Sequence, residues 1–231
     1  MTNENVIEAS NVTKVYNTEQ IGVKALNSLS LTIKRGEFSA IAGPSGSGKT
    51  TLLNVISGLD SLTSGKVSLS GKLISDMSPG ELADFRKHHV GFIFQSYNLI
   101  PVLTVCENIE YVMMLQGVEA KKRRQKIKDI LKEVGLEGKE DIFPSHLSGG
   151  QQQRVAIARA IVSKPDIILA DEPTANLDSH TGEELLEIMK HLNEKHNMTF
   201  VFSTHDKMIM EKSKRLVMLK DGEIISDENK T

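Results

Sequence analysis

Cysteine is nearly absent from this sequence, because Cys106 is the single example in 231 residues. One cysteine forms no disulfide within the chain, and no group of cysteine and histidine residues has the spacing of a structural zinc site. These absences exclude a fold stapled by disulfides within the chain. They are typical of a reducing compartment, so we expect a cytoplasmic protein.

Long apolar runs and a surplus of either charge are also missing. No apolar run approaches the roughly 18 residues that a transmembrane helix requires, and the first ten residues, MTNENVIEAS, lack the pattern of a secretory signal. We therefore expect no direct insertion into a membrane. Lysine and arginine total 28 against 30 aspartate and glutamate residues. This balance provides no electrostatic footprint for nucleic acid, so we expect no nucleic-acid partner.

Short β-favouring runs and amphipathic segments follow one another along the chain, without internal repeats or proline-rich linkers. More strand than helix before residue 36, and β-α alternation in the second half, indicate an α/β core with an antiparallel β edge. The expected strands are residues 6–15, 29–33, 38–42, 66–70, 90–94, 167–170, 199–203 and 215–219. The expected helices are residues 49–57, 120–134, 151–162, 181–195 and 207–212.

The length suits one sizeable domain with a smaller lobe attached, whereas two independent domains would be hard to fit into 231 residues. Residues 96–163 look mainly helical and are the best candidate for an inserted lobe. We therefore expect a single domain over residues 1–231, with residues 1–95 and 164–231 forming the α/β core and its β subdomain. Asp221-Gly222 is typical of a hairpin turn near the end of the chain.

The octet GPSGSGKT, residues 43–50, matches the phosphate-binding pattern G-x-x-x-x-G-K-[ST] without a mismatch, between an expected strand and an expected helix. Its glycines let successive backbone N–H groups point at an anion, and the helix adds the positive end of its dipole. We predict that Lys49 reaches the β- and γ-phosphates of a nucleoside triphosphate, and that Thr50 supplies an oxygen to Mg²⁺. The predicted phosphate-loop residues are Gly43, Pro44, Ser45, Gly46, Ser47, Gly48, Lys49, Thr50 and Thr51.

Two carboxylates end the apolar strand IILADE, residues 167–172. Ligands of such sheets lie beyond the carboxyl ends of the strands, which favours a functional role. Because side chains alternate along a strand, we expect Asp171 and Glu172 to point in different directions. We predict that Asp171 faces Mg²⁺, through water, and that Glu172 is the general base for an attacking water. The alternative for the dipeptide alone is a solvated strand end.

A second pair of glycines lies in LSGGQQQRVAIARA, residues 147–160. This segment repeats the arrangement of a hydroxyl, two glycines and an amphipathic helix, so it is a second anion-binding helix start. The two helix starts are separated by about a hundred residues. One chain with two such sites requires an explanation.

The segments GPSGSGKT, LSGGQ and ILADEP together resemble the ATP-binding-cassette (ABC) ATPases, in which LSGGQ is the hallmark pentapeptide. The resemblance covers nearly the whole chain. It implies a P-loop NTPase core with an antiparallel β subdomain and an inserted α-helical subdomain, and ATP and Mg²⁺ as ligands. It also implies that Tyr16 stacks on adenine, that Gln95 joins the Mg²⁺ and water network, and that His205 contacts the γ-phosphate. Taken alone, Tyr16 and His205 would more often be structural.

In the ABC family two cassettes pack head to tail, so that each ATP lies between the phosphate loop of one chain and the LSGGQ of the other. The resemblance therefore implies a homodimer that ATP binding closes and hydrolysis reopens. Asp178 also suits a helix N-cap before Ser179, and both roles stay open. The residues implied to contact the partner's nucleotide are Ser148, Gly149, Gly150, Gln151 and Asp178.

The stretch SYNLIPVLTVCENIEY, residues 96–111, resembles the cassettes that serve lipoprotein release, macrolide and peptide export and a cell-division complex. This resemblance implies an integral membrane permease subunit as partner and a peripheral place on the cytoplasmic face of the membrane. The basic run KKRRQK, residues 121–126, fits the exposed side of an amphipathic helix better than an anionic-lipid site. Four residues fit either a docking groove for the permease or the core of the helical lobe: Leu99, Ile100, Val102 and Leu103.

Two functions from different classes stay open at this point. One is an ATPase that drives a membrane export complex, and the other is a nucleotide-dependent scaffold with little turnover. The presence of Glu172 and His205 favours the ATPase. A DNA-maintenance ATPase with the same ATP-binding head normally needs a long coiled-coil arm, for which 231 residues leave no room. Antibiotic-resistance and ribosome-associated cassettes usually join two ATP-binding heads in one chain, and this sequence has one set of the motifs.

Overall fold

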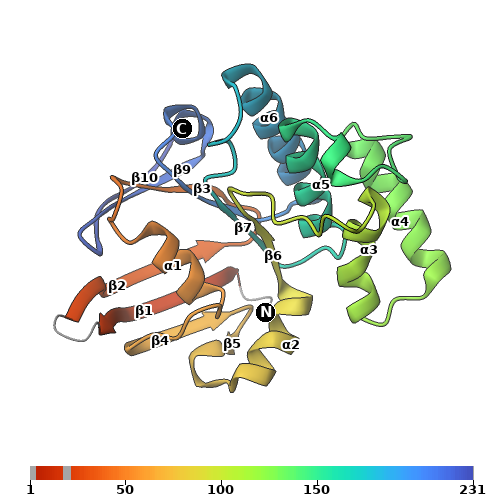
Figure 1. Ribbon diagram of the computed structural model, residues 1–231. Helices are drawn as coiled ribbons and strands as arrows, with labels where there is room; N and C mark the ends of the chain where they lie inside the picture. Colours follow the sequence, from red (N-terminus) through yellow and green to blue (C-terminus); the bar gives the residue numbers. More distant parts are fainter. Residues whose placement is uncertain (1–3, 18–21, 231) are drawn as a thin grey trace.

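The computed structural model describes residues 4–17 and 22–230, and its elements form two sheets with helices packed around them (Figure 1). A four-stranded antiparallel sheet has the order β2-β1-β4-β5. Its strands are β1 (Asn5–Asn17), β2 (Gly22–Lys34), β4 (Ser64–Leu69) and β5 (Lys72–Leu73). This sheet confirms the antiparallel β edge expected from the sequence.

The second sheet has six strands in the order β10-β9-β3-β8-β7-β6. The strands from β9 to β6 are parallel, and β10 pairs antiparallel with β9 at the edge. All residues of β3 and β8 are buried, because both faces of the sheet are covered, and these strands therefore read as continuous apolar runs. The strands are β3 (Phe38–Ala42), β6 (Val90–Ile93), β7 (Ile167–Asp171), β8 (Phe200–Thr204), β9 (Arg215–Lys220) and β10 (Glu223–Asn229).

Helix α1 lies between the two sheets (Figure 1). Its Leu52 and Leu53 are fully buried and belong to one hydrophobic cluster with Ile7 and Val67 of the antiparallel sheet and Ile41 of the parallel sheet. No helix of the described residues is both long and apolar enough to cross a membrane. The α-helices described are α1 (Lys49–Ile56), α2 (Pro79–His89), α3 (Val105–Leu115), α4 (Ala120–Glu133), α5 (Gly149–Ile161), α6 (Ser179–His196) and α7 (Lys207–Lys212).

Helices α3, α4 and α5 gather on the side of the molecule away from the antiparallel sheet (Figure 1). A second hydrophobic cluster joins Ile109 of α3, Leu131 of α4 and Val155 of α5 to the other face of the parallel sheet. Helix α5 approaches β6 closely because Gly91 has no side chain where a Cβ would collide with the carbonyl of Ala160. The boundaries proposed for the helical lobe, residues 96–163, stay a prediction.

Two helices of 11 residues, α2 and α3, are missing from the expected helices. Helix α3 lies within residues 96–163, which were expected to be mainly helical, whereas no helix was expected at α2. Among its residues only Phe85 is buried, so the helix has no apolar stripe that periodicity would detect. A local signal is nevertheless present. The hydroxyl of Ser78 accepts from the backbone N–H of Glu81, whose carboxylate accepts from the N–H of Ser78, and Pro79 occupies the first turn. Thr104 and Glu107 form the same capping box at the start of α3.

The predicted hairpin turn is confirmed at Asp221-Gly222. Both residues have positive φ, 50° and 78°, and Lys220 pairs with Glu223 across the two-residue turn between β9 and β10. The turn also contacts the phosphate loop, because the N–H of Gly222 donates to the carbonyl of Ser47 at 3.0 Å. The turn between β9 and β10 thus supports the phosphate loop, residues 43–50, through a backbone hydrogen bond.

Candidate functional site

The octet 43–50 forms a tight loop between β3 and α1, at the mouth of a cleft of about 1040 Å³. Two glycines are required by close packing. A Cβ on Gly43 would collide with the carbonyl of Leu219, and one on Gly48, which has a φ of 101°, would collide with the carbonyl of Ala25. The predicted site residues that line the cleft are Pro44, Ser45, Gly46, Gly48, Lys49, Thr50, Thr51, Gln95, Glu172 and His205.

Lys49 is folded back over its own loop and is only 8% exposed. Its ammonium group donates to the carbonyls of Gly43 at 2.8 Å and Pro44 at 3.0 Å. An ammonium has three donors, so one is left for a ligand in the cleft. Ser47, within the same loop, is buried, and its hydroxyl has no hydrogen-bond partner among the described residues.

Thr50 and Asp171 bring α1 and the end of β7 together. The Thr50 hydroxyl lies 3.1 and 3.2 Å from the two carboxylate oxygens of Asp171. A hydroxyl and a carboxylate are oxygen donors of the kind that Mg²⁺ prefers beside phosphates. The donor set therefore fits the predicted ion, although no group of three or more histidine, cysteine or acidic residues gathers for a metal within residues 4–17 and 22–230.

Glu172 follows β7 and points to the end of β8 instead of to Thr50. Its Oε1 lies 2.6 Å from Nδ1 of His205, and its Oε2 accepts from the hydroxyl of Thr204 at 3.1 Å and the N–H of His205 at 3.4 Å. The φ of Glu172 is 45°, a strained conformation of the kind that clusters at active sites. The two adjacent carboxylates therefore face different partners, as the alternation of side chains predicts, and His205 stays largely exposed to the cleft.

Tyr16 is the last residue but one of β1, and 40% of its surface is exposed. It is not among the residues that line the cleft. Its hydroxyl donates to Asp60 at 2.7 Å, and the ammonium of Lys14 lies 4.8 Å from the ring centre while also donating to Asp60. Burial and the Asp60 hydrogen bond raise the pKa of Tyr16. Lys14 and Asp60 hold the ring in one orientation, and no sequence motif indicated either residue.

The LSGGQ segment starts α5 away from the cleft. Ser148 is the exposed N-cap, whose hydroxyl accepts from the N–H of Gln151 at 3.3 Å while the Gln151 amide oxygen accepts from the N–H of Ser148. Gly149 is partly buried, and Gly150 is fully packed, because a Cβ there would collide with the side chain of Thr181. None of residues 148–151 lines the cleft described above.

Asp178 caps α6 next to this segment, which confirms one of its two predicted roles. Its carboxylate accepts from the N–H of Thr181 at 3.0 Å and from the Thr181 hydroxyl at 2.7 Å. The two hydrogen bonds hold the pKa of Asp178 below its ordinary value. The side chain is exposed, so the cap leaves it accessible to a second chain.

Residues 26–175 match the family model described as ABC transporter. The chain belongs to the ABC transporter family. It is an ABC transporter ATP-binding domain, and the phosphate loop, the LSGGQ segment and the intervening strands and helices all lie in the matched region.

Several relatives of this cassette have nearly the same length. The ATP-binding protein MJ0796 of Methanocaldococcus jannaschii is 44% identical, over 96% of this chain and 97% of that protein. A dimeric structure of a post-hydrolysis state of the MJ0796 cassette, bound to ADP and Pi, has a TM-score of 0.89 at 43% identity, covering 96% of this chain and 98% of that chain. YtrE of Bacillus subtilis, an ABC transporter ATP-binding protein, is 48% identical over 87% of each chain.

Other relatives are longer than this cassette. The macrolide export ATP-binding/permease protein MacB of Mannheimia succiniciproducens is 44% identical over 98% of this chain. The chain spans only 35% of the length of that relative. The likeness is thus to the ATP-binding part of a protein that carries further segments.

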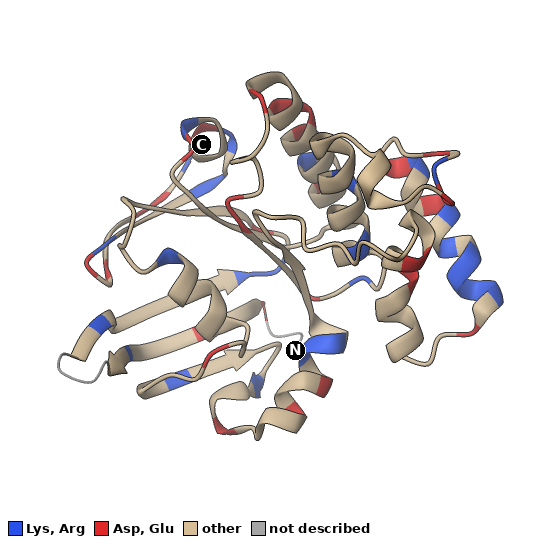
Figure 2. Ribbon diagram, in the orientation of Figure 1, with Lys and Arg blue, Asp and Glu red and all other residues tan. Residues whose placement is uncertain are grey.

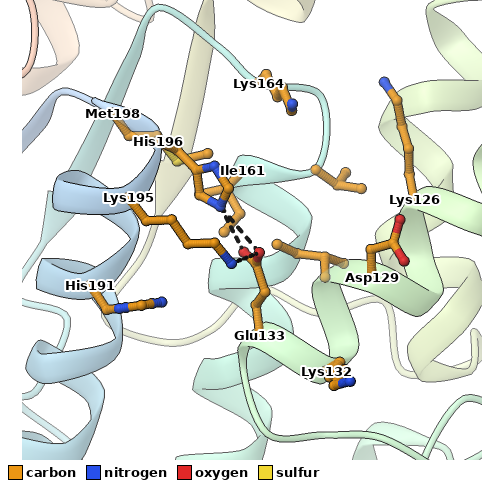
Figure 3. Close-up of a pocket in the computed structure, with 12 residues that line it drawn as sticks. Lys126, Asp129, Lys132, Glu133, Ile161, Lys164, His191, Lys195, His196 and Met198 are labelled. Carbon is orange, nitrogen blue, oxygen red and sulfur yellow. Dashed lines mark hydrogen bonds and ion pairs between the residues drawn. The ribbon is translucent and has the colours of Figure 1, made fainter.

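A separate groove of about 810 Å³ lies between α4 and the end of α6 in the cassette (Figure 3). Glu133 extends into it and pairs with Lys195 at 2.7 Å and with His196 at 3.1 Å. Although burial acts to raise the pKa of Glu133, these two partners hold it below its ordinary value. Because the Glu133 carboxylate is already paired with Lys195 and His196, we assign no catalytic or binding role to this groove.

The basic run 121–126 lies on α4, where Lys and Arg gather along the outer side of the helix (Figure 2). The same helix buries Ile127, Ile130 and Leu131 on its inner side. Arg123 is paired with Glu110 of α3 at 2.7 Å. The segment is therefore an amphipathic helix with an exposed cationic side, as predicted.

Replacing Tyr16 with alanine should weaken ATP binding by about tenfold, because a base stacked on an aromatic ring contributes about 1–3 kcal/mol. Binding of inorganic tripolyphosphate should not change, since that ligand has no base. Titration calorimetry with both ligands measures the difference. Tyr111→Ala on α3 is the matched control, because that ring is similarly exposed. Equal weakening of both ligands would remove Tyr16 from base recognition.

Proposed function

We propose that the chain is the ATP-hydrolysing subunit of an ABC export complex, with ATP and water as substrates. The observation that carries this proposal is the pairing of Glu172 with His205 in the cleft that also contains Lys49 and Thr50. A phosphate loop alone would account for nucleotide binding but not for hydrolysis. A carboxylate that Thr204 and His205 hold in a fixed orientation at the same cleft is positioned to take a proton from water.

The phosphate loop and Lys49 bind the β- and γ-phosphates through backbone N–H groups, the start of α1 and the free donor of the ammonium group. Thr50 and Asp171, with the Gln95 amide, would hold Mg²⁺, which when bound neutralises charge on the phosphate oxygens. Glu172 accepts a proton from the water that attacks the γ-phosphorus, while the bond to the β-phosphate oxygen breaks and ADP leaves. His205 orients Glu172 and reaches the γ-phosphate.

The second anion site is explained by a head-to-tail homodimer. Residues 148–151 lie outside their own cleft, and Ser148 is exposed at the start of α5, so its hydroxyl is available to a second chain. The MJ0796 relative has been solved as a dimer, which supports this arrangement. ATP would join two copies, and loss of the γ-phosphate would release them. The residues proposed to act in the partner's site are Ser148, Gly149, Gly150, Gln151 and Asp178.

An integral membrane permease is the proposed partner, of the lipoprotein-release or macrolide-export type, which places the cassette at the cytoplasmic face of the membrane. The name of MacB as an ATP-binding/permease protein supports this proposal. Apolar side chains are available for docking. Val102 is 77% exposed and Ile100 is 36% exposed, whereas Leu99 packs against the hydrophobic cluster of the helical segments.

Purification of tagged chain from native membranes in mild detergent, followed by mass spectrometry of the companion polypeptide, tests the partner. Measurement of ATP turnover by the purified complex tests the activity, with Glu172→Gln as the inactive control. Turnover that depends on Glu172 supports the ATPase. Negligible turnover in both complexes would support the scaffold instead, because that function uses the same cleft without hydrolysis.

A further inference from the structure

Helix α5 carries one fully buried amide, the side chain of Gln153. Its Nε2 donates to the carbonyl of Pro173 at 2.8 Å and lies 3.4 Å from the carbonyl of Phe94. Its Oε1 has no hydrogen-bond partner among the residues described. A buried amide oxygen without a partner costs free energy, so packing alone does not explain a glutamine at this place.

The two carbonyls that accept from Gln153 adjoin the proposed catalytic residues. The Phe94 carbonyl belongs to the peptide that leads into Gln95, and Pro173 directly follows Glu172. Both segments leave neighbouring strands, since β6 pairs in parallel with β7. One amide group thus bridges the two chain segments that carry Gln95 and Glu172.

The same helix carries the LSGGQ segment at its first turn. Ser148 caps α5, and the helix continues without interruption to Ile161, so Gln153 moves with the segment proposed to contact the partner's nucleotide. Asn176 adds a second bridge, because its amide donates to the carbonyl of Gln95 at 3.0 Å. The start of α5 and the catalytic segments of one chain are therefore joined by direct hydrogen bonds.

We propose that Gln153 is a positioning residue that sets the spacing of Gln95 and Glu172 and ties this spacing to α5, the helix that the LSGGQ segment of the same chain starts. The inference rests on the proposed ATPase function. Gln153 is not among the residues that line the cleft. It acts by fixing two backbone carbonyls, and because a small misplacement of a general base is costly, it affects the chemical step more than binding.

Gln153→Met tests the proposal, because methionine has a similar shape but donates no hydrogen bond. The expected result is a fall in kcat of about tenfold, with the KM for ATP within about twofold of wild type. Asn193→Leu is the matched control. Asn193 is also a buried amide, and it donates to the carbonyls of Gly36 at 2.9 Å and Met198 at 2.6 Å, away from the cleft. Both variants should lower Tm, and only Gln153→Met should lower kcat.

A second measurement separates positioning from folding. In a chain that also carries Glu172→Gln, Gln153→Met should still form the ATP-dependent dimer, observed by gel filtration. Loss of that dimer, or a kcat for Gln153→Met equal to that of Asn193→Leu, overturns the positioning role. Failure of the underlying ATPase proposal looks different, because the wild-type chain and Glu172→Gln would then both show negligible ATP turnover.

Discussion

Replacing Lys49 with alanine is expected to weaken ATP binding by about 10- to 100-fold, since a hydrogen bond to a charged group contributes about 1.5–3 kcal/mol. The lysine is held over the phosphate loop by two carbonyls and keeps one donor for a phosphate. The variant loses that donor and its charge, and the loop also loses the bonds that fix Gly43 and Pro44. Calorimetric titration with a non-hydrolysable ATP analogue measures the change.

The control for Lys49→Ala is Lys128→Ala, which removes the same charge from the exposed side of α4. It should bind the analogue as tightly as the wild type. Wild-type affinity in Lys49→Ala would show that the octet does not bind phosphate here. Equal weakening in both variants would instead point to a general electrostatic effect, which the near balance of charges in this sequence makes unexpected.

Replacing Glu172 with glutamine is expected to lower ATP turnover by about a thousandfold and to leave ATP binding intact. Glutamine has nearly the same shape, and its amide oxygen still accepts from Thr204 and the His205 N–H. It accepts no proton from water, so hydrolysis stops after the dimer has closed. Phosphate release assays measure turnover, and gel filtration in the presence of ATP detects the trapped dimer.

The control for Glu172→Gln is Glu184→Gln on α6, where the carboxylate pairs with Arg154 on the surface. That variant should retain wild-type turnover. A Glu172→Gln protein that stayed fully hydrolytic would remove Glu172 from the role of general base. A protein that lost turnover without accumulating an ATP-bound dimer would contradict the proposed order of closing and hydrolysis.

The sequence predicts best where one short segment contains the whole signal. The octet 43–50 carries its glycines, its lysine and its threonine together, between a strand and a helix. LSGGQ is equally local, and the turn at Asp221-Gly222 needs only two residues. The strand before Asp171 is predicted because burial on both faces makes it a continuous apolar run.

Prediction failed where the signal depends on partners distant in the sequence. Lys14 and Asp60 hold Tyr16 across 46 residues, and no spacing rule connects them. Gln153 looks like one more polar residue in QQQR until the fold places it under Pro173. Helix α2 is hard to predict for a different reason, because it buries one side chain only and is marked only locally, by its capping box and by Pro79 in its first turn.

Each ATP is proposed to be held by the phosphate loop of one chain and the LSGGQ segment of another, and every step of the proposed cycle requires this shared site. Mixing two inactive variants, Lys49→Ala and Ser148→Arg, tests this claim directly. In a mixed dimer, one site combines the intact phosphate loop of the Ser148→Arg chain with the intact LSGGQ segment of the Lys49→Ala chain. Turnover should reappear, up to about a quarter of the wild-type value, because half of the dimers are mixed and each has one complete site. No recovery in the mixture, while Ser148→Arg alone still binds ATP, would contradict the shared site.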